Sequence, residues 1–263
     1  MSITIAITGA AGRMGSRLVA LGHQSPDFEV AGAIERADHA MLGRDAGEIA
    51  GVGGIGVSLT ADLKSEPQVL IDFTAPASMR QWLSACRKRR IAMLIGTTGL
   101  GPADHQLIDQ AASDIPVLQA SNMSLGVAVL NKLAAQAAQI LGDDYDIEIV
   151  EAHHRFKKDA PSGTAMSLAD GILNATHKTR DALTHDRHGD DVPRQRGEIG
   201  MHSLRIGDDV GRHTAYFAAL GERLELTHVA TNRDTFVHGA LRAAKWLASQ
   251  KPGRYTINDV LGL

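Results

Sequence analysis

The sequence predicts an α/β protein in which a parallel-sheet domain is joined to a smaller α+β domain. Two observations carry this prediction. In the first half of the chain, short β-branched runs alternate with helical patterns, which is typical of a parallel sheet covered on both faces. After residue 198, three strand-like runs follow one another closely, which indicates a second sheet that is mixed and largely antiparallel.

Composition and charge are those of a soluble globular protein. The 263 residues are 44% hydrophobic and 22% charged, so a folded core is expected and disorder is not. A net charge of −3 gives no bulk electrostatic case for binding nucleic acid or an anionic membrane. We expect no signal peptide and no apolar run of membrane-spanning length. A single cysteine, Cys86, excludes an internal disulfide and suits the cytoplasm.

The first half of the chain is expected to build the parallel sheet. Apolar runs predict strands at Ile3–Thr8, Glu29–Ile34, Val69–Phe73, Met93–Gly96 and Val117–Gln119. Helical spacing predicts the intervening helices at Arg13–Gln24, Ala77–Arg90 and Ala103–Ser113. The glycine-rich segment 41–59 is interpreted as a long connection with a weak strand at its end.

The second half has a different pattern. An alanine-rich helix is expected over Leu125–Leu141, followed by a strand at Asp146–Ala152 and a helix at Ser162–Asn174. Segment 177–198 is expected to be a flexible excursion because it is polar and charged. Further strands are expected at Gly200–Arg205, His213–Leu220 and Arg223–Ala230, and a final helix at Thr235–Ser249 precedes a short tail. The turn at Gly221-Glu222 makes the last two strands antiparallel. We therefore expect one domain from residues 1–124 with 234–263 returning to it, and a second domain from residues 125–233.

The first strand runs directly into a glycine pattern, Gly9-Ala10-Ala11-Gly12-Arg13-Met14-Gly15. Gly9 permits a tight turn, Gly12 lets the backbone approach a pyrophosphate, and Gly15 allows close packing of helix on strand. An acidic residue at the end of the next strand, Glu35, completes the pattern. The sequence therefore predicts a Rossmann-type dinucleotide site.

The choice of dinucleotide stays open. Glu35 can accept hydrogen bonds from both ribose hydroxyls, which favours NADH. Arg36 can pair with a 2′-phosphate, which favours NADPH. We therefore expect either NADPH or NADH as cofactor.

Three further turns follow predicted strands, at the sheet edge where ligands bind in open α/β sheets. They present backbone amides and small hydroxyls, and we expect them to line the nicotinamide end of the site. Their residues are Phe73 and Thr74, Gly96, Thr97 and Thr98, and Ser121, Asn122 and Met123.

The segment 148–165 concentrates basic side chains. His153 and His154 are neighbours on a strand, so they are expected to point to opposite faces. Histidine titrates near neutrality, and Lys157 adds a compact positive charge close by. This pattern predicts a site that holds and protonates a small anion. Metal binding is not expected, because no nearby ligand set has metal spacing.

A helix begins directly after this basic segment. Ser162 or Thr164 can cap it through a hydroxyl, and Gly163 leaves backbone amides open to an incoming oxyanion. A carboxylate bound there would gain charge-assisted hydrogen bonds. A plain helix cap is the alternative, and the adjacent cations favour an anion site.

These motifs together resemble the dihydrodipicolinate reductase (4-hydroxy-tetrahydrodipicolinate reductase) family of lysine and diaminopimelate biosynthesis. The resemblance covers nearly the whole chain and is most specific at residues 151–165, EAHHRFKKDAPSGTA. Phe156, Lys158 and Arg212 depart from the family pattern.

The resemblance implies a cofactor domain and a substrate-binding domain, assembled as a homotetramer through the second domain's sheet. It implies reduction of a heterocyclic dicarboxylate by NADPH or NADH. His153 would be the general acid and Lys157 would assist protonation, while His154 and the Ser162-Gly163-Thr164 turn would hold carboxylates. Residues Gly9–Met14, Glu35, Arg36, Gly96–Thr98 and Ser121–Met123 would contact the cofactor, and Arg233 would lie at the return hinge.

Two other functions remain open from the residues alone. One is an NAD(P)-dependent oxidoreductase of another small carboxylic acid, which would share the cofactor half. The other is a non-catalytic dinucleotide sensor, against which the cationic cluster argues because a sensor needs no proton donor.

Overall fold

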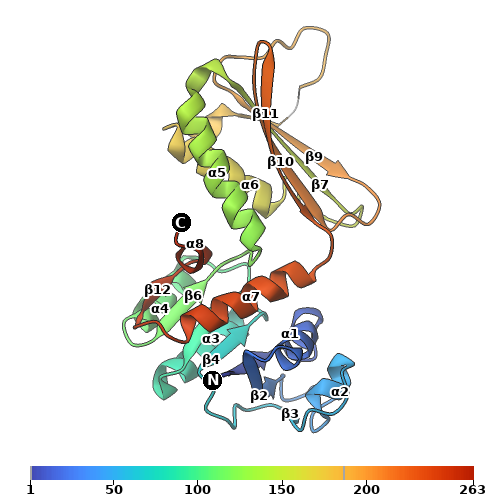
Figure 1. Cartoon of the computed structure of the whole chain (residues 1–263), viewed down its shortest axis with the longest axis vertical. Helices are drawn as coiled ribbons and strands as arrows, with labels where there is room; N and C mark the ends of the chain where they lie inside the picture. The colour runs from blue at the N-terminus through green and yellow to red at the C-terminus, as the bar shows by residue number, and fades with distance from the viewer. Residues whose placement is uncertain (1, 186) are drawn as a thin grey trace. The chain divides into compact units, whose positions relative to one another are not determined.

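The structure, a computed structural model, describes residues 2–185 and 187–263. It divides into two compact units (Figure 1). The first comprises Met1–Ser124 and Asp234–Leu263, and the second comprises Leu125–Arg233.

The first unit is built on a parallel sheet of order β12-β6-β5-β4-β1-β2-β3. Its strands are β1 (Ile3–Thr8), β2 (Phe28–Ile34), β3 (Leu59–Thr60), β4 (Val69–Asp72), β5 (Ala92–Ile95), β6 (Pro116–Gln119) and β12 (Gly253–Tyr255). The pairings between the described strands of this sheet are all parallel. The order reverses direction between β1 and β4, so a switch point lies at their carboxyl ends. The predicted Rossmann-type fold is confirmed.

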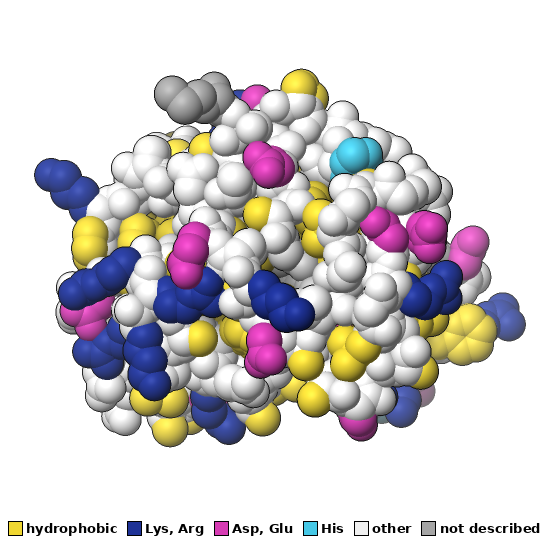
Figure 2. All heavy atoms as spheres, turned by 90° about the horizontal axis from the view of Figure 1, so that it is seen from below, with side chains coloured by type: hydrophobic (Ala, Val, Ile, Leu, Met, Phe, Trp, Pro, Cys, Tyr) yellow, Lys and Arg dark blue, Asp and Glu magenta, His cyan; other side chains and the backbone are white. Residues whose placement is uncertain are grey.

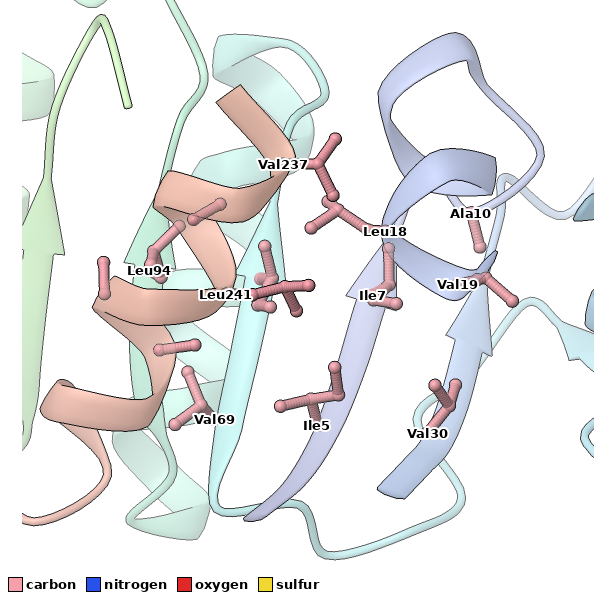
Figure 3. Close-up of a cluster of buried hydrophobic side chains, with 14 of the residues drawn as sticks. Ile5, Ile7, Ala10, Leu18, Val19, Val30, Val69, Leu94, Val237 and Leu241 are labelled. Atoms are coloured by element: carbon pink, nitrogen blue, oxygen red, sulfur yellow. The ribbon is translucent and has the colours of Figure 1, made fainter. Parts of the chain in front are cut away.

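Helices bury an apolar core on each face of this sheet. One face is covered by α1 (Arg13–Gln24) and α7 (Asp234–Leu247), whose Leu18 and Leu241 pack against Ile5 and Ile7 (Figure 3). The other face is covered by α3 (Pro76–Arg89) and α4 (Pro102–Ala112), which enclose Leu70 and Met93. Strands buried on both faces are apolar along most of their length, which explains why β4, apart from its last residue, and β5 show no alternation.

The second unit contains a mixed sheet of order β11-β10-β7-β9-β8. Its strands are β7 (Asp146–His153), β8 (Leu183–Thr184), β9 (Ile199–Arg205), β10 (Gly211–Ala219) and β11 (Glu222–Ala230). Two helices, α5 (Leu125–Leu141) and α6 (Gly163–Ala175), pack with the sheet in one core that contains Leu168, Ile149 and Phe217. The opposite face of the sheet carries exposed apolar residues such as Leu204 and Val229.

The second sheet is mixed, as expected from the sequence, and the two kinds of pairing meet at β7. β10 pairs antiparallel with both β11 and β7, and the turn joining β10 to β11 is the predicted one. β9, however, lies on the other side of β7 and is parallel to it, as β8 is to β9. Because β7 and β9 are parallel, their last residues lie side by side, with His153 opposite Arg205.

Helix α5 and the 3-10 turn η1 (Gly142–Asp144) form a continuous helix of 20 residues, which by length and composition is long and apolar enough to cross a membrane. The sequence predicts no apolar run of that length. A core helix of a soluble protein satisfies the same measure, and Leu130, Ala134 and Ala138 lie in the core of the second unit. Length and composition are therefore weak evidence for a membrane segment.

Short elements occur where connections were expected. Segment 41–59 contains α2 (Ala46–Ala50), which is capped by Asp45. The Asp45 carboxylate also accepts hydrogen bonds from the amides of Ile55 and Gly56. Segment 177–198 contains η2 (Arg180–Ala182) and β8, and the tail contains β12 and α8 (Ile257–Leu261). Of these elements, β8 and β12 depend on distant pairing partners, so local sequence patterns do not reveal them.

Surface charge is mixed on the face of the molecule displayed in Figure 2. Lys and Arg side chains there are interspersed with Asp and Glu. Such a surface presents no single-sign field over that face, in keeping with the small net charge of −3.

Candidate active site

The loop between β1 and α1 is a backbone cradle without room for side chains. Gly9 has φ +64°, and a Cβ at Gly15 would collide with the carbonyl oxygen of Gly9. Gly12 begins α1, and within the described chain no side chain caps that helix end. The first-turn amides are therefore available to an anion, and the residues present fit the pyrophosphate of a dinucleotide.

The acidic residue expected to select the ribose lies beside this cradle. A Cβ at Gly9 would lie 3.9 Å from Oε1 of Glu35, and Oε2 of Glu35 accepts the amide of Arg36 at 3.1 Å. The Arg36 guanidinium is exposed and pairs with Asp38 at 3.1 Å. A solvent-exposed pair of this kind is weak, so Arg36 can exchange Asp38 for a ribose phosphate.

The turns after β4 and β5 meet the glycine cradle. A Cβ at Gly9 would lie 3.0 Å from the methyl group of Thr74, and a Cβ at Gly96 would collide with the ring of Phe73. The amide of Thr74 donates to Oγ1 of Thr97 at 2.9 Å. The structure thus brings together these three stretches, which the sequence placed far apart.

A buried carboxylate that the sequence analysis missed organises these turns. Asp72, the last residue of β4, is fully buried, and its oxygens accept hydrogen bonds from three threonine hydroxyls. The donors are Thr8 at 2.7 Å, Thr74 at 2.7 Å and Thr97 at 2.5 Å. Because these hydroxyl protons point inward, Thr74 and Thr97 are left with backbone groups and methyl groups to offer a cofactor. Thr98 is exposed.

The turn after β6 also offers mainly backbone. The side chain of Met123 is buried in the core, and its carbonyl faces Gly239, where any Cβ would collide with it. Oδ1 of Asn122 accepts the amide of Ser124 at 2.8 Å. Ser121 is exposed, so its hydroxyl is accessible to a ligand.

In the second unit, His153 ends β7 and is only 8% exposed. Its Nδ1 lies 2.6 Å from Oε2 of Glu151. A carboxylate accepts hydrogen bonds, so Nδ1 carries the proton and Nε2 is left for exchange with a ligand. Burial lowers the pKa of His153 and outweighs the opposing effect of Glu151.

Glu151 connects several parts of this cluster. It is fully buried, and its two oxygens accept a bidentate pair from Arg205, at 2.9 and 2.8 Å. Oε1 also accepts the amide of Ser162 at 3.1 Å. Burial raises the pKa of Glu151, but hydrogen bonds from Arg205, His153 and Ser203 together hold it below its usual value.

Lys157 is the partly buried lysine of the segment. Its Nζ lies 2.9 Å from Oδ2 of Asp159, an ion pair that lowers the pKa of Asp159. Lys158 is exposed, and so are two other residues that depart from the family pattern, Phe156 and Arg212. Burial therefore distinguishes Lys157 from its exposed neighbour Lys158.

The start of α6 has the expected geometry for an anion. Oγ of Ser162 accepts the amide of Ala165 at 3.1 Å, so the predicted hydroxyl cap is Ser162. Gly163 is exposed, and a Cβ there would meet open space. The amide end of this 13-residue helix begins ten residues after His153 and six after Lys157 along the chain.

His154 follows the last residue of β7, and its environment differs from that of His153. His154 is half-buried, its ring lies 6.2 Å from the ring of Phe156, and its Nδ1 has no hydrogen-bond partner in the described chain. Among residues 2–185 and 187–263, no group of three His, Cys, Asp or Glu side chains could hold a metal ion.

Arg205 and His213 also belong to the cluster, although no sequence motif points to them. Arg205 reaches Glu151 because β9 lies beside β7 and runs parallel to it. His213 lies opposite Glu151 on β10, 5.1 Å from the ring of His153. Strand pairing decides both placements, and no local motif encodes it.

Comparisons with known proteins agree along the whole chain. The sequence model described as "Dihydrodipicolinate reductase, N-terminus" matches residues 3–123, and "Dihydrodipicolinate reductase, C-terminus" matches residues 126–261. A 4-hydroxy-tetrahydrodipicolinate reductase from Geotalea uraniireducens (strain Rf4) is 48% identical over 265 residues, which cover 99% of each sequence. The corresponding protein of Citrifermentans bemidjiense is 46% identical with the same coverage.

Solved structures share the fold. A dipicolinate-bound dihydrodipicolinate reductase from Paenisporosarcina sp. TG-14 has a TM-score of 0.80 at 24% identity, covering 98% of this chain and 99% of that one. A probable dehydrogenase from Thermotoga maritima has a TM-score of 0.62 at 11% identity, covering 98% and 92%. From the sequence matches, this chain belongs to the dihydrodipicolinate reductase family.

Proposed function

We propose that the protein is a 4-hydroxy-tetrahydrodipicolinate reductase, which uses NADPH or NADH to form tetrahydrodipicolinate for lysine and diaminopimelate biosynthesis. Identity of 48% over 99% of a relative with that name supports the assignment. The observation that carries it is the buried Glu151–His153 pair beside the Ser162 helix start. This arrangement combines a proton donor with a carboxylate cradle.

The first unit holds the cofactor. Residues Gly9–Met14 take the pyrophosphate, Glu35 and Arg36 take the adenosine ribose, and the turns at 73–74, 96–98 and 121–123 line the nicotinamide end. A bound nicotinamide supplies the hydride. The inward-pointing hydroxyls of Thr74 and Thr97 keep the shape of this pocket fixed.

The second unit holds the dicarboxylate. The Ser162-Gly163-Thr164 turn binds one carboxylate through the amides of Gly163 and Thr164, as a helix N-terminus binds anions, and His154 contributes to binding. When substrate binds, the ammonium group of Lys157 leaves the carboxylate of Asp159, whose side chain is half-exposed. It then forms an ion pair with a substrate carboxylate instead. Two negative charges near His153 then raise its pKa and favour the imidazolium.

The chemical step needs one hydride and one proton. Loss of water from the hydroxylated ring gives a conjugated imine, hydride adds to one end of that system, and the resulting enamine carbon takes a proton. His153 donates this proton from Nε2, while Glu151 accepts from Nδ1 and stabilises the imidazolium. Hydride donor and proton donor belong to different units, so turnover requires both to close on the bound molecules.

The protein assembles as a homotetramer through the second sheet and works in the cytoplasm. The face of the sheet opposite α5 and α6 exposes Leu204 and Val229, at 47% and 52%, which a subunit interface would bury. Arg212 lies in register with Val229 on this face. Light scattering on the protein and on a Leu204→Glu/Val229→Glu variant tests the assembly: a tetramer that dissociates in the variant supports it.

The activity is tested by coupled turnover. The product of the preceding synthase is supplied as substrate, and oxidation of NADH or NADPH is followed separately by absorbance. Turnover with at least one cofactor supports the assignment. Tight cofactor binding without turnover of this substrate, in protein shown to be folded, would contradict it.

A further inference from the structure

The hydroxyl of Ser162 is surrounded on two sides within the second unit. The residue is 1% exposed, and its Oγ accepts the amide of Ala165 at 3.1 Å. The same Oγ lies 3.0 Å from Nε2 of His213, on β10. Since Oγ has one proton to donate and two lone pairs, the role of His213 decides where that proton points.

His213 is a buried histidine in which one of the two ring nitrogens has a hydrogen-bond partner. It is 4% exposed, and its Nδ1 has no hydrogen-bond partner in the described part of the chain. Burial, together with the nearby charge of His153, lowers the pKa of His213 to about 4. The imidazole is therefore neutral near pH 7 and carries a single proton.

The unpaired Nδ1 shows which nitrogen carries that proton. With the proton on Nδ1, the protein would contain a buried N–H without an acceptor, which native structures rarely tolerate. With the proton on Nε2, Nδ1 is an acceptor without a donor, which is less unfavourable. Nε2–H then donates to Ser162, and both lone pairs of Oγ are occupied, one by Ala165 and one by His213.

We propose that His213 is a positioning residue: its Nε2–H fixes the Ser162 hydroxyl so that this hydroxyl donates its own proton to a carboxylate bound at the start of α6. The inference rests on the carboxylate role proposed above for residues 162–164. The Ser162 hydroxyl would thus donate to the carboxylate in addition to the helix amides. His213, which lies outside the basic segment, would gain a role in substrate binding. His213 touches the serine and has no contact with substrate.

The tautomer can be measured directly in the unmodified protein. ¹⁵N NMR of histidine-labelled protein at pH 7 distinguishes a proton on Nε2 from one on Nδ1, and the His213 signals are assigned with a His213→Gln variant. The proposal requires a neutral ring with the proton on Nε2. A proton on Nδ1, or a charged ring at pH 7, would overturn it.

Two substitutions separate donation from packing. Gln at position 213 can keep an N–H near the place of Nε2, whereas Phe keeps the ring volume and removes the donor. The probe is dipicolinate, an aromatic dicarboxylate that resists hydride addition, titrated calorimetrically at saturating NADPH. We expect His213→Phe to raise its dissociation constant about ten-fold and His213→Gln to raise it less than about three-fold. Equal weakening by both variants would contradict the proposal.

A double-mutant cycle with Ser162→Ala completes the test. Without the hydroxyl, His213→Phe has nothing to orient, and we expect it to change the dipicolinate dissociation constant less than about two-fold. An undiminished effect of His213→Phe in the Ser162→Ala protein would overturn the inference. If His213→Phe does not fold, as judged by circular dichroism, the tautomer measurement and the Gln variant still decide.

The two proposals fail in different ways. If the protein reduces no 4-hydroxy-tetrahydrodipicolinate and binds no dipicolinate, the proposed function is wrong. If the unmodified protein does both and His213→Phe binds dipicolinate as tightly as it does, only the role of His213 is wrong.

Discussion

Oε2 of Glu151 and Nδ1 of His153 lie 2.6 Å apart at the end of β7, two residues from each other on one strand. Both are buried, and Arg205 satisfies the carboxylate from its other side. The pair fixes the tautomer of the proposed acid before any ligand arrives, so that catalysis needs no reorientation of the ring.

The first prediction concerns Glu151→Gln. The amide keeps the size of the side chain but removes the charge that stabilises the imidazolium, so kcat is expected to fall about a hundred-fold. The dissociation constant for NADPH, measured by fluorescence titration, should stay unchanged because Glu151 belongs to the other unit. A variant that retains full kcat would show that the pair has no catalytic role.

The two neighbouring lysines offer a matched comparison. Lys157→Ala removes the partly buried ammonium that pairs with Asp159, and we expect kcat/KM to fall by two orders of magnitude or more. Lys158→Ala changes an exposed side chain and should leave kcat/KM within about two-fold. Steady-state kinetics of both variants decide which lysine acts, and the opposite ranking would move the role to Lys158.

Stability should depend on pH through His213. Its pKa is about 4 in the folded protein against 6.5 normally, so the unfolded chain takes up a proton at higher pH than the folded chain does. The contribution is fully present above pH 6.5 and is lost as pH falls toward 4, by about 3 kcal/mol in the free energy of unfolding.

Urea denaturation at pH 7 and pH 4.5 measures this effect. His213→Gln should lose less stability between these two values than the unmodified protein does. Burial also lowers the pKa of His153 and His228, so some loss on acidification remains in the variant. An identical loss in both proteins would show that His213 is not protonated on unfolding in this range.

Asp72 is expected to support cofactor binding without touching the substrate. Asp72→Ala frees the hydroxyls of Thr8, Thr74 and Thr97 and leaves them without a shared acceptor. We predict an NADPH dissociation constant raised about ten-fold or more, together with a lower melting temperature. Unchanged NADPH affinity in the folded variant would show that this network serves the core alone.

Much of the fold could be predicted because the decisive signals are local. The glycine spacing from Gly9 to Gly15 and the apolar runs at β4 and β5 reflect constraints that a few consecutive residues must meet. The placement of β9 could not be predicted in this way. Its parallel pairing with β7 depends on a long connection and on which sheet edge is free.

The site shows the same division. His153, Lys157 and Ser162 lie in one continuous segment, and their residue types alone suggest anion binding. Glu151 lies in that segment too, but its role depends on burial, which the sequence does not display. Arg205, His213 and Asp72 reach their partners only through strand register or the sheet's carboxyl edge, so nothing near them in the sequence indicates a function.

The measurement that tests the account most directly is a crystal structure of the protein with NADPH and dipicolinate together. We predict one carboxylate of dipicolinate on the turn 162–164, held by the amides of Gly163 and Thr164, with Lys157 and Nε2 of His153 within hydrogen-bonding or ion-pairing distance of the ligand. A complex in which both carboxylates bind away from residues 153–164 would contradict the roles assigned to that segment.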